Sequence, residues 1–76
     1  MRILLVEDDP VLADGLARIL QQSQHLVSLA NNGGYADQLL QLEKFDLVIL
    51  DMGLPDMDGA QILRRLRARQ NAVPVL

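Results

Sequence analysis

The 76-residue chain has no cysteine and no tryptophan, and it has only one tyrosine and one phenylalanine. Without cysteine it can form neither disulfides nor thiolate metal sites. Its apolar runs are far too short to cross a bilayer. A strand-like pattern starts directly after Met1 and Arg2, which leaves no room for a signal peptide. We therefore expect a cytoplasmic protein with no membrane attachment.

Acidic residues only slightly outnumber basic residues. The net charge of −3 gives the chain no overall attraction to nucleic acid or to anionic membranes. Hydrophobic residues make up 50% of the chain, which is enough for a packed core and too many for a disordered tail. The length allows one small domain at most. A fold of this size buries only about 60% of the surface of its unfolded chain, so we expect marginal stability.

Two continuous apolar runs, residues 3–6 and 47–50, are the strongest secondary-structure signals. Unbroken apolar runs of this length are typical of parallel strands that are covered on both faces. Residues 26–30 predict a further strand. Residues 73–76 predict the opening of another, because Pro74 is tolerated at the start of a strand.

Helical patterns separate these strands. Asp9 followed by Pro10 is typical of an N-cap and first helical residue. We expect the helix after them to bury one apolar face, made of Leu12, Leu16, Ile19 and Leu20.

A second helix follows the turn-forming residues 31–34, with Tyr35, Ala36, Leu39 and Leu40 on one side. A third begins near Gly59, with Ile62, Leu63 and Leu66 inward and Arg64, Arg65, Arg67 and Arg69 mostly outward.

The order βαβαβα, followed by the start of a fourth strand, predicts an α/β fold with a doubly wound parallel sheet and right-handed crossovers. Three helices cover such a sheet poorly. We therefore expect residues 1–76 to be the N-terminal part of a larger domain, an incomplete single domain with an open sheet edge. Such an edge can pair with another chain.

Acidic residues follow both apolar runs. Glu7, Asp8 and Asp9 come directly after residues 3–6, and Asp51 comes directly after residues 47–50. The carboxyl ends of neighbouring parallel strands meet at the edge where open α/β sheets bind ligands. Two negative charges about 4 Å apart repel by roughly 4 kcal/mol at an effective dielectric constant of about 20. We therefore expect a cation to bind the cluster and offset this repulsion. Few, hard oxygen ligands favour Mg²⁺ over a Ca²⁺ cage. Helix capping explains Asp9 well, but it does not explain Asp51.

Residues 3–9, 47–55 and 57–59, taken in this order and spacing, resemble the receiver domain of two-component response regulators. The opening is similar to that of the winged-helix, OmpR-type transcriptional regulators. The resemblance implies a flavodoxin-like or CheY-like fold, truncated here after the third helix and the start of the fourth strand. It implies phosphorylation by a sensor histidine kinase in the presence of Mg²⁺, and DNA binding only through a domain outside this chain.

The resemblance also implies a role for individual residues. Asp51 matches the phosphoryl acceptor. Glu7 and Asp8 match the acidic pair that holds Mg²⁺, and Gly53 matches the residue whose backbone carbonyl completes the metal site. Pro55 and Gly59 match positions that shape the loop into the third helix. The chain would not be an enzyme with an external substrate, since only an intact domain catalyses its own phosphorylation.

Three partner residues of this family have no counterpart here: a Ser or Thr after the fourth strand, and a Lys and an aromatic residue on the fifth. Lys44 is the only lysine and lies at the wrong end of the predicted sheet. We therefore expect the chain alone to bind Mg²⁺ weakly and to be phosphorylated poorly.

Two other functions stay open. The chain could act only as an interaction module that dimerises or exchanges elements with a second copy. It could also be a Mg²⁺-dependent phosphohydrolase, although those with an aspartate nucleophile usually carry a second Asp two residues later, where this chain has Gly53. The arginines of the third helix could mark a nucleic-acid surface, but a solvated helix face explains them more simply.

Overall fold

A computed structural model describes all 76 residues. Strands and helices alternate along the chain, as the sequence predicts. The elements are β1 (Arg2–Val6), α1 (Pro10–Gln22), β2 (Leu26–Ala30), α2 (Gly33–Leu42), β3 (Leu47–Leu50) and α3 (Gly59–Ala68). None of the three helices is long and apolar enough to cross a membrane.

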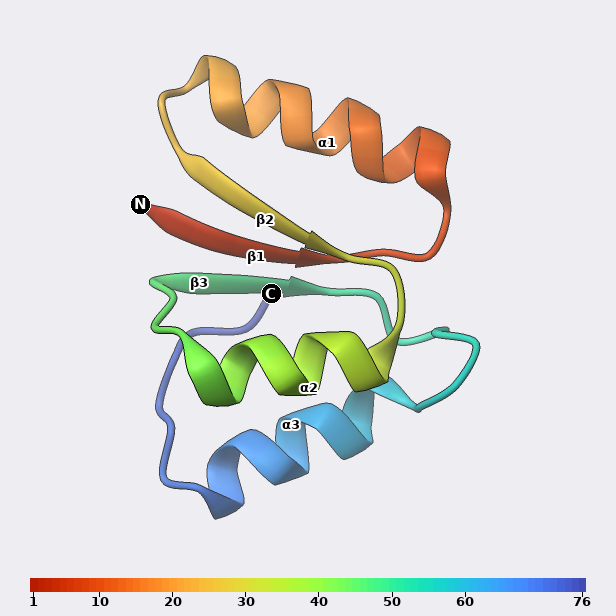
Figure 1. Cartoon of the computed structure of the whole chain (residues 1–76), viewed down its shortest axis with the longest axis vertical. Helices are drawn as coiled ribbons and strands as arrows, with labels where there is room; N and C mark the ends of the chain where they lie inside the picture. Colours follow the sequence, from red (N-terminus) through yellow and green to blue (C-terminus); the bar gives the residue numbers. More distant parts are fainter.

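The three strands form one parallel sheet in the order β2-β1-β3. Val6, the last residue of the central strand β1, pairs with Ala30 on β2 and with Leu50 on β3. All three strands therefore end at the same edge of the sheet, where their arrowheads meet in Figure 1. The acids that follow β1 and β3 are brought together by this register.

The helices form a layer on each side of the sheet. Helix α1 covers one face, and α2 and α3 lie together on the other (Figure 1). Strand β1 is buried on both faces between residues 3 and 6, as predicted. The larger hydrophobic cluster lies on the side of α2 and α3. Its ten buried members are Leu4, Val6, Ala30, Ala36, Leu40, Val48, Leu50, Ile62, Leu66 and Val73.

The predicted buried face of α1 is partly wrong. The residues of α1 that are buried are Ala13 and Ala17, while Leu12 is 49% exposed and Ile19 is 61% exposed. Leu16 and Leu20 are half-buried. Helix α1 packs on β1 and β2 through its two alanines, so its apolar stripe is wider than the surface beneath it.

Strand β3 is also less covered than its apolar run predicts. Val48 and Leu50 are buried against α2 and α3, but Leu47 and Ile49 are only half-buried. Side chains along a strand alternate between the two faces of the sheet. Leu47 and Ile49 therefore face the side of α1, which lies over the other two strands.

After α3 the chain returns to the outer edge of β3. Val75 pairs with Val48 as a single parallel bridge. Main-chain hydrogen bonds support it: the amide of Val48 donates to the carbonyl of Pro74 at 2.9 Å, and the amide of Leu76 donates to the carbonyl of Val48 at 2.8 Å. The fourth strand predicted at residues 73–76 is thus present as an isolated bridge rather than as a strand.

Candidate functional site

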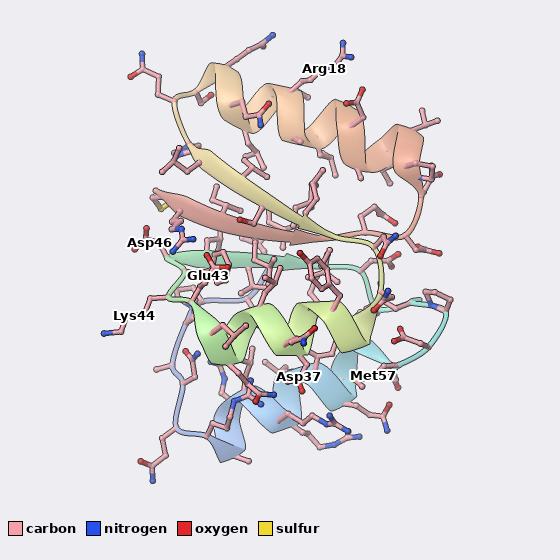
Figure 2. The ribbon with its side chains drawn as sticks, viewed as in Figure 1. Arg18, Asp37, Glu43, Lys44, Asp46 and Met57 are labelled. Carbon is pink, nitrogen blue, oxygen red and sulfur yellow. The ribbon has the colours of Figure 1, made fainter.

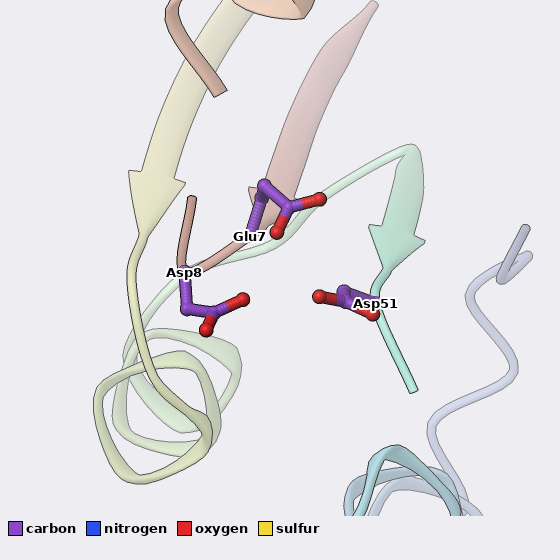
Figure 3. Close-up of side chains that lie close together, drawn as sticks. All are labelled: Glu7, Asp8 and Asp51. Carbon is purple, nitrogen blue, oxygen red and sulfur yellow. The ribbon is translucent and has the colours of Figure 1, made fainter. Parts of the chain in front are cut away.

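Three carboxylates meet at the carboxyl edge of the sheet. Glu7 and Asp8 follow β1, and Asp51 follows β3. Each offers one oxygen, and these oxygens all lie within 4.8 Å of one another. Figure 3 shows the Glu7 and Asp8 side chains on one side and Asp51 facing them from the other. The structure therefore brings together the three acids that the sequence singles out.

Main-chain hydrogen bonds hold Asp51 in place. Its amide donates to the carbonyl of Val6 at 3.0 Å, which extends the pairing of β3 with β1 by one residue. Its carboxylate Oδ1 accepts the amide of Gly53 at 3.0 Å, so Gly53 lies directly beside the acid. The Asp51 side chain is half-buried, which leaves it open to solvent on one side.

The close spacing of the acids changes their pKa values in opposite directions. The amide of Asp9 lowers the pKa of Glu7, but partial burial and the neighbouring carboxylates of Asp51 and Asp8 outweigh it, so the pKa of Glu7 is raised. The amide of Gly53 and hydrogen bonds with Glu7 and Asp8 lower the pKa of Asp51. Of these two acids, Glu7 keeps a proton more readily and Asp51 stays ionised.

Asp9 does not belong to the cluster. Its Oδ1 accepts the amides of Val11 at 3.0 Å and Leu12 at 3.3 Å, which satisfies two free N–H groups at the start of α1. Its own amide donates to Glu7 Oε2 at 3.2 Å. The prediction of Asp9 as a helix cap is confirmed, and the cap also orients Glu7.

The loop between β3 and α3 contains two further acids, and both cap helices. Asp58 accepts the amide of Ala60 at 3.0 Å, and with Gln61 it forms a capping box at the start of α3. Asp56 accepts two amides at the start of α2, from Gly33 and Gly34. Sequence reasoning missed this role of Asp56, because a contact across 23 residues leaves no local pattern.

The chemistry of the three acids fits a small hard cation. Mg²⁺ takes carboxylate oxygens and usually keeps several waters, so a half-open site with few protein ligands suits it. An open hollow of about 560 Å³ borders Glu7 and Asp8, with Asp14, Asn31 and Tyr35 among its other lining residues, and Asp51 does not line it. The hollow leaves room for waters beside Glu7 and Asp8.

Lys44, Arg65 and Arg69 lie away from these acids. Lys44 precedes β3, at the opposite end of the strand from Asp51, as predicted. Arg65 on α3 and Arg69, the residue that caps the end of α3, bind the buried carboxylate of Asp37 on α2, at 3.2 Å and 3.0 Å. Figure 2 shows Asp37 between the two helices. These arginines therefore stabilise helix packing, and their carboxylate partner was not predicted.

Comparison with known proteins gives the family. Residues 3–76 match the response regulator receiver domain. The chain is 42% identical over all 76 residues to the transcriptional regulatory protein TctD of Salmonella typhimurium, and 40% identical to the transcriptional regulatory protein BasR of Escherichia coli. It spans 34% of the length of each of these relatives. Both names describe transcriptional regulators, in agreement with the predicted subfamily.

Solved structures give the fold. The receiver domain of HemR from Leptospira biflexa, in its non-phosphorylated form, superposes on 97% of this chain with a TM-score of 0.90 and 36% identity, and the match covers 60% of that chain. The response regulator TrrA of Thermotoga maritima, solved in complex with Mg²⁺-BeF, superposes on 97% of this chain with a TM-score of 0.92 and 30% identity, and the match covers 64% of that chain. The three strands and three helices thus have the predicted CheY-like arrangement, and this chain belongs to the response regulator receiver domain family.

Proposed function

We propose that this chain carries the phosphoryl-acceptor site of a two-component signalling protein, with Asp51 as the acceptor. The observation that carries the proposal is the meeting of Glu7, Asp8 and Asp51, whose oxygens lie within 4.8 Å of one another at the carboxyl edge of the sheet. A sensor histidine kinase would be the donor, in the cytoplasm. The regulated output would be transcription, through a DNA-binding domain outside this chain.

Asp51 suits the role of acceptor because its lowered pKa keeps its carboxylate ionised and the amide of Gly53 holds that carboxylate in place. One of its oxygens attacks the phosphorus atom, and the bond between phosphorus and the donor nitrogen breaks. The electron pair of that bond stays with the histidine of the kinase, and Asp51 becomes an aspartyl phosphate. The chain is an acceptor in this reaction rather than an enzyme with an external substrate.

Glu7, Asp8 and Asp51 would hold Mg²⁺, together with the backbone carbonyl of Gly53. Bound there, Mg²⁺ supplies positive charge that offsets the negative oxygens of the phosphoryl group. The residues of the chain do the positioning. The hydrogen bond from Asp51 to Val6 fixes the acceptor on the sheet, and the amide of Asp9 orients Glu7 toward the cluster.

The relatives support Mg²⁺ in particular. TrrA was solved with Mg²⁺-BeF, and its fold matches this chain closely. Within these 76 residues, the lysine and hydroxyl groups that the family resemblance implies are not supplied near Asp51. We therefore expect residues 1–76 alone to accept a phosphoryl group slowly, and a receiver domain that contains the remaining strands to accept it readily.

The test uses the 76-residue chain and a chimera in which these residues replace the matching part of TctD. Each protein is incubated with acetyl phosphate and Mg²⁺, and its intact mass is measured. The chimera should gain the mass of one phosphoryl group, and the gain should vanish with EDTA or with Asp51→Asn. An Asp51→Asn chimera that gains the same mass in the same time would refute the assignment of Asp51.

A second candidate function is self-association, which exposed apolar side chains support. Large apolar side chains are exposed on α1 and β2, among them Val11, Ile19 and Leu29, and Leu47 and Ile49 of β3 are only half-buried on the side of α1. We propose that the isolated chain covers this surface by self-association. Light scattering across a concentration series tests the idea, with a dimer or larger species expected and a folded monomer at every concentration contradicting it.

A further inference from the structure

The Asp56 side chain ties the loop after β3 to the first turn of α2. Its Oδ1 accepts the amide of Gly33 at 2.7 Å, and its Oδ2 accepts the amide of Gly34 at 2.9 Å. These amides belong to the first two residues of α2 and have no partner within the helix. One carboxylate therefore satisfies two helix N–H groups from a loop that is distant in sequence.

The loop also packs directly on the start of this helix. A Cβ atom added at Gly33 would lie 2.7 Å from Cβ of Met57, which is too close for any side chain larger than hydrogen. Figure 2 shows Met57 at the start of α2. The glycine thus permits the close approach that brings Asp56 within hydrogen-bonding distance of both amides.

The remainder of the loop has few polar contacts. At its first end, Asp51 is bound to Val6, and Gly53 is bound to the Asp51 carboxylate. Where the loop ends, at the start of α3, the amide of Gly59 donates a long hydrogen bond of 3.4 Å to the carbonyl of Met52. Between them, the main chain of residues 54–57 makes no hydrogen bond to the rest of the protein. The Asp56 carboxylate is the polar anchor of this stretch.

We propose that Asp56 is a positioning residue for the candidate magnesium site: by fixing the loop after β3 to the start of α2, it sets where Gly53 stands relative to Glu7, Asp8 and Asp51. Asp56 is not one of the acids whose oxygens gather at the site. It acts through the backbone of the loop that contains Gly53. This inference rests on the proposed function, because it assumes that these acids bind Mg²⁺.

The ionisation of Asp56 is consistent with this role. The amides of Gly33 and Gly34 lower the pKa of its carboxyl group, so it is a full acceptor for both bonds at neutral pH. The start of α2 also favours a negative charge, because the helix dipole is positive there. An asparagine in this place would keep the shape but offer one acceptor oxygen instead of two.

The chain offers a matched control in Asn32. Its side chain caps the same helix by accepting the amide of Tyr35 at 2.8 Å, but it does not bind the loop. Asn32→Ala and Asp56→Ala therefore both remove a cap from α2, and only Asp56→Ala releases the loop. A difference between the two variants separates positioning of the site from general stability of the helix.

The test follows the ¹⁵N-labelled 76-residue chain by NMR during titration with Mg²⁺, using the amide signals of Asp51 and Gly53. We expect Asp56→Ala to weaken Mg²⁺ binding by roughly tenfold, in the range found for residues that support metal ligands. Asp56→Asn should lose less, and Asn32→Ala should stay within about twofold of wild type. Equal affinities for wild type and Asp56→Ala, or equal losses for Asp56→Ala and Asn32→Ala, would overturn the proposal.

Amide relaxation and hydrogen exchange without metal give a second readout. In Asp56→Ala, the amides of Gly53 and Leu54 should become more mobile and exchange faster, while Asn32→Ala leaves them unchanged. Unchanged loop amides in Asp56→Ala would refute the anchoring role, even if the variant binds Mg²⁺ weakly. A wild-type chain and chimera that both fail to bind Mg²⁺ would instead refute the proposed function, while the loop measurement would still report whether Asp56 anchors the loop.

Discussion

The amide of Asp51 donates a hydrogen bond to the carbonyl of Val6, 3.0 Å away. This bond lies one residue beyond the last paired residues of β1 and β3, so the two strands continue side by side into the acidic site. Val6 is followed by Glu7 and Asp8, and the bond therefore fixes the distance between the acceptor and both acids. The site is a direct consequence of the parallel register.

The raised pKa of Glu7 predicts that the site weakens the ion-free fold. An acid whose pKa is raised on folding lowers stability at pH values above its ordinary range, because the folded state then holds an unfavourable charge. Glu7→Gln should raise the free energy of unfolding in EDTA at pH 7 by up to about 1 kcal/mol, the repulsion of two charges about 4 Å apart in a water-like medium. Urea denaturation measures this change.

Saturating Mg²⁺ should reverse the order of the two proteins. Wild type gains stability from binding the ion, whereas Glu7→Gln has lost a charged ligand and gains less. A Glu7→Gln variant that is less stable than wild type in EDTA would show that Glu7 does not carry an unfavourable charge.

We expect the protein to be less stable in acid because the hydrogen bonds of Asp56 weaken there. Its pKa is lowered by the amides of Gly33 and Gly34, so its contribution is complete above the ordinary aspartate range and is lost as the pH falls through the lowered value. Urea midpoints from pH 7 down to about pH 2.5 should fall in wild type. Asp56→Asn should start lower at pH 7 and fall less, and parallel curves for the two proteins would contradict this account.

We expect Asp37 to stabilise the protein by linking α2 to α3. It is buried and accepts hydrogen bonds from Arg65, Arg69 and Gln41. Asp37→Ala should lower the free energy of unfolding by about 1–3 kcal/mol, because it leaves these donors without their acceptor. The control is Arg64→Ala on the same helix, an exposed residue with no ion pair. Equal chemical-denaturation midpoints for the two variants would rule out the link.

We expect replacement by alanine to have opposite effects on stability at Gly15 and at Gly59. Gly15 lies inside α1 with no atom near its missing Cβ, so Gly15→Ala should stabilise the protein by roughly 0.5–1 kcal/mol through helix propensity. At Gly59 an added Cβ would lie 2.7 Å from Sδ of Met52 and 3.0 Å from its Cα. Gly59→Ala should therefore destabilise by about 1–3 kcal/mol. Thermal melts of both variants test the pair, and a shift of the same sign in both would contradict it.

The residues that sequence patterns could place are those with local signals. The apolar runs of residues 3–6 and 47–50 predicted β1 and β3, and their parallel pairing then predicted the meeting of Glu7 and Asp51. Asp9 and Pro10 predicted the start of α1, because a cap and a proline act on the residues next to them. The strands and the start of α1 depend on the chain within a few residues, and the meeting of the acids then follows from the parallel pairing of the two strands.

The unpredicted features depend on contacts between distant segments. The salt bridges of Asp37 join α2 to Arg65 on α3 and to Arg69 at the end of α3, and nothing in either segment alone indicates a partner. Periodicity gave the apolar stripe of α1 but not its extent of burial. Leu12 and Ile19 are exposed because only two strands lie beneath the helix, which is a property of the whole sheet.

The central claim, that Asp51 accepts the phosphoryl group, is tested most directly by trapping the product. Aspartyl phosphate is reduced by borohydride to homoserine, which marks the modified residue in a peptide map. After treatment of the TctD chimera with acetyl phosphate and Mg²⁺, we predict homoserine at position 51 and unmodified acids at positions 7, 8 and 9. Homoserine at position 8 or 9, or 5-hydroxynorvaline at Glu7, with Asp51 intact, would contradict the account.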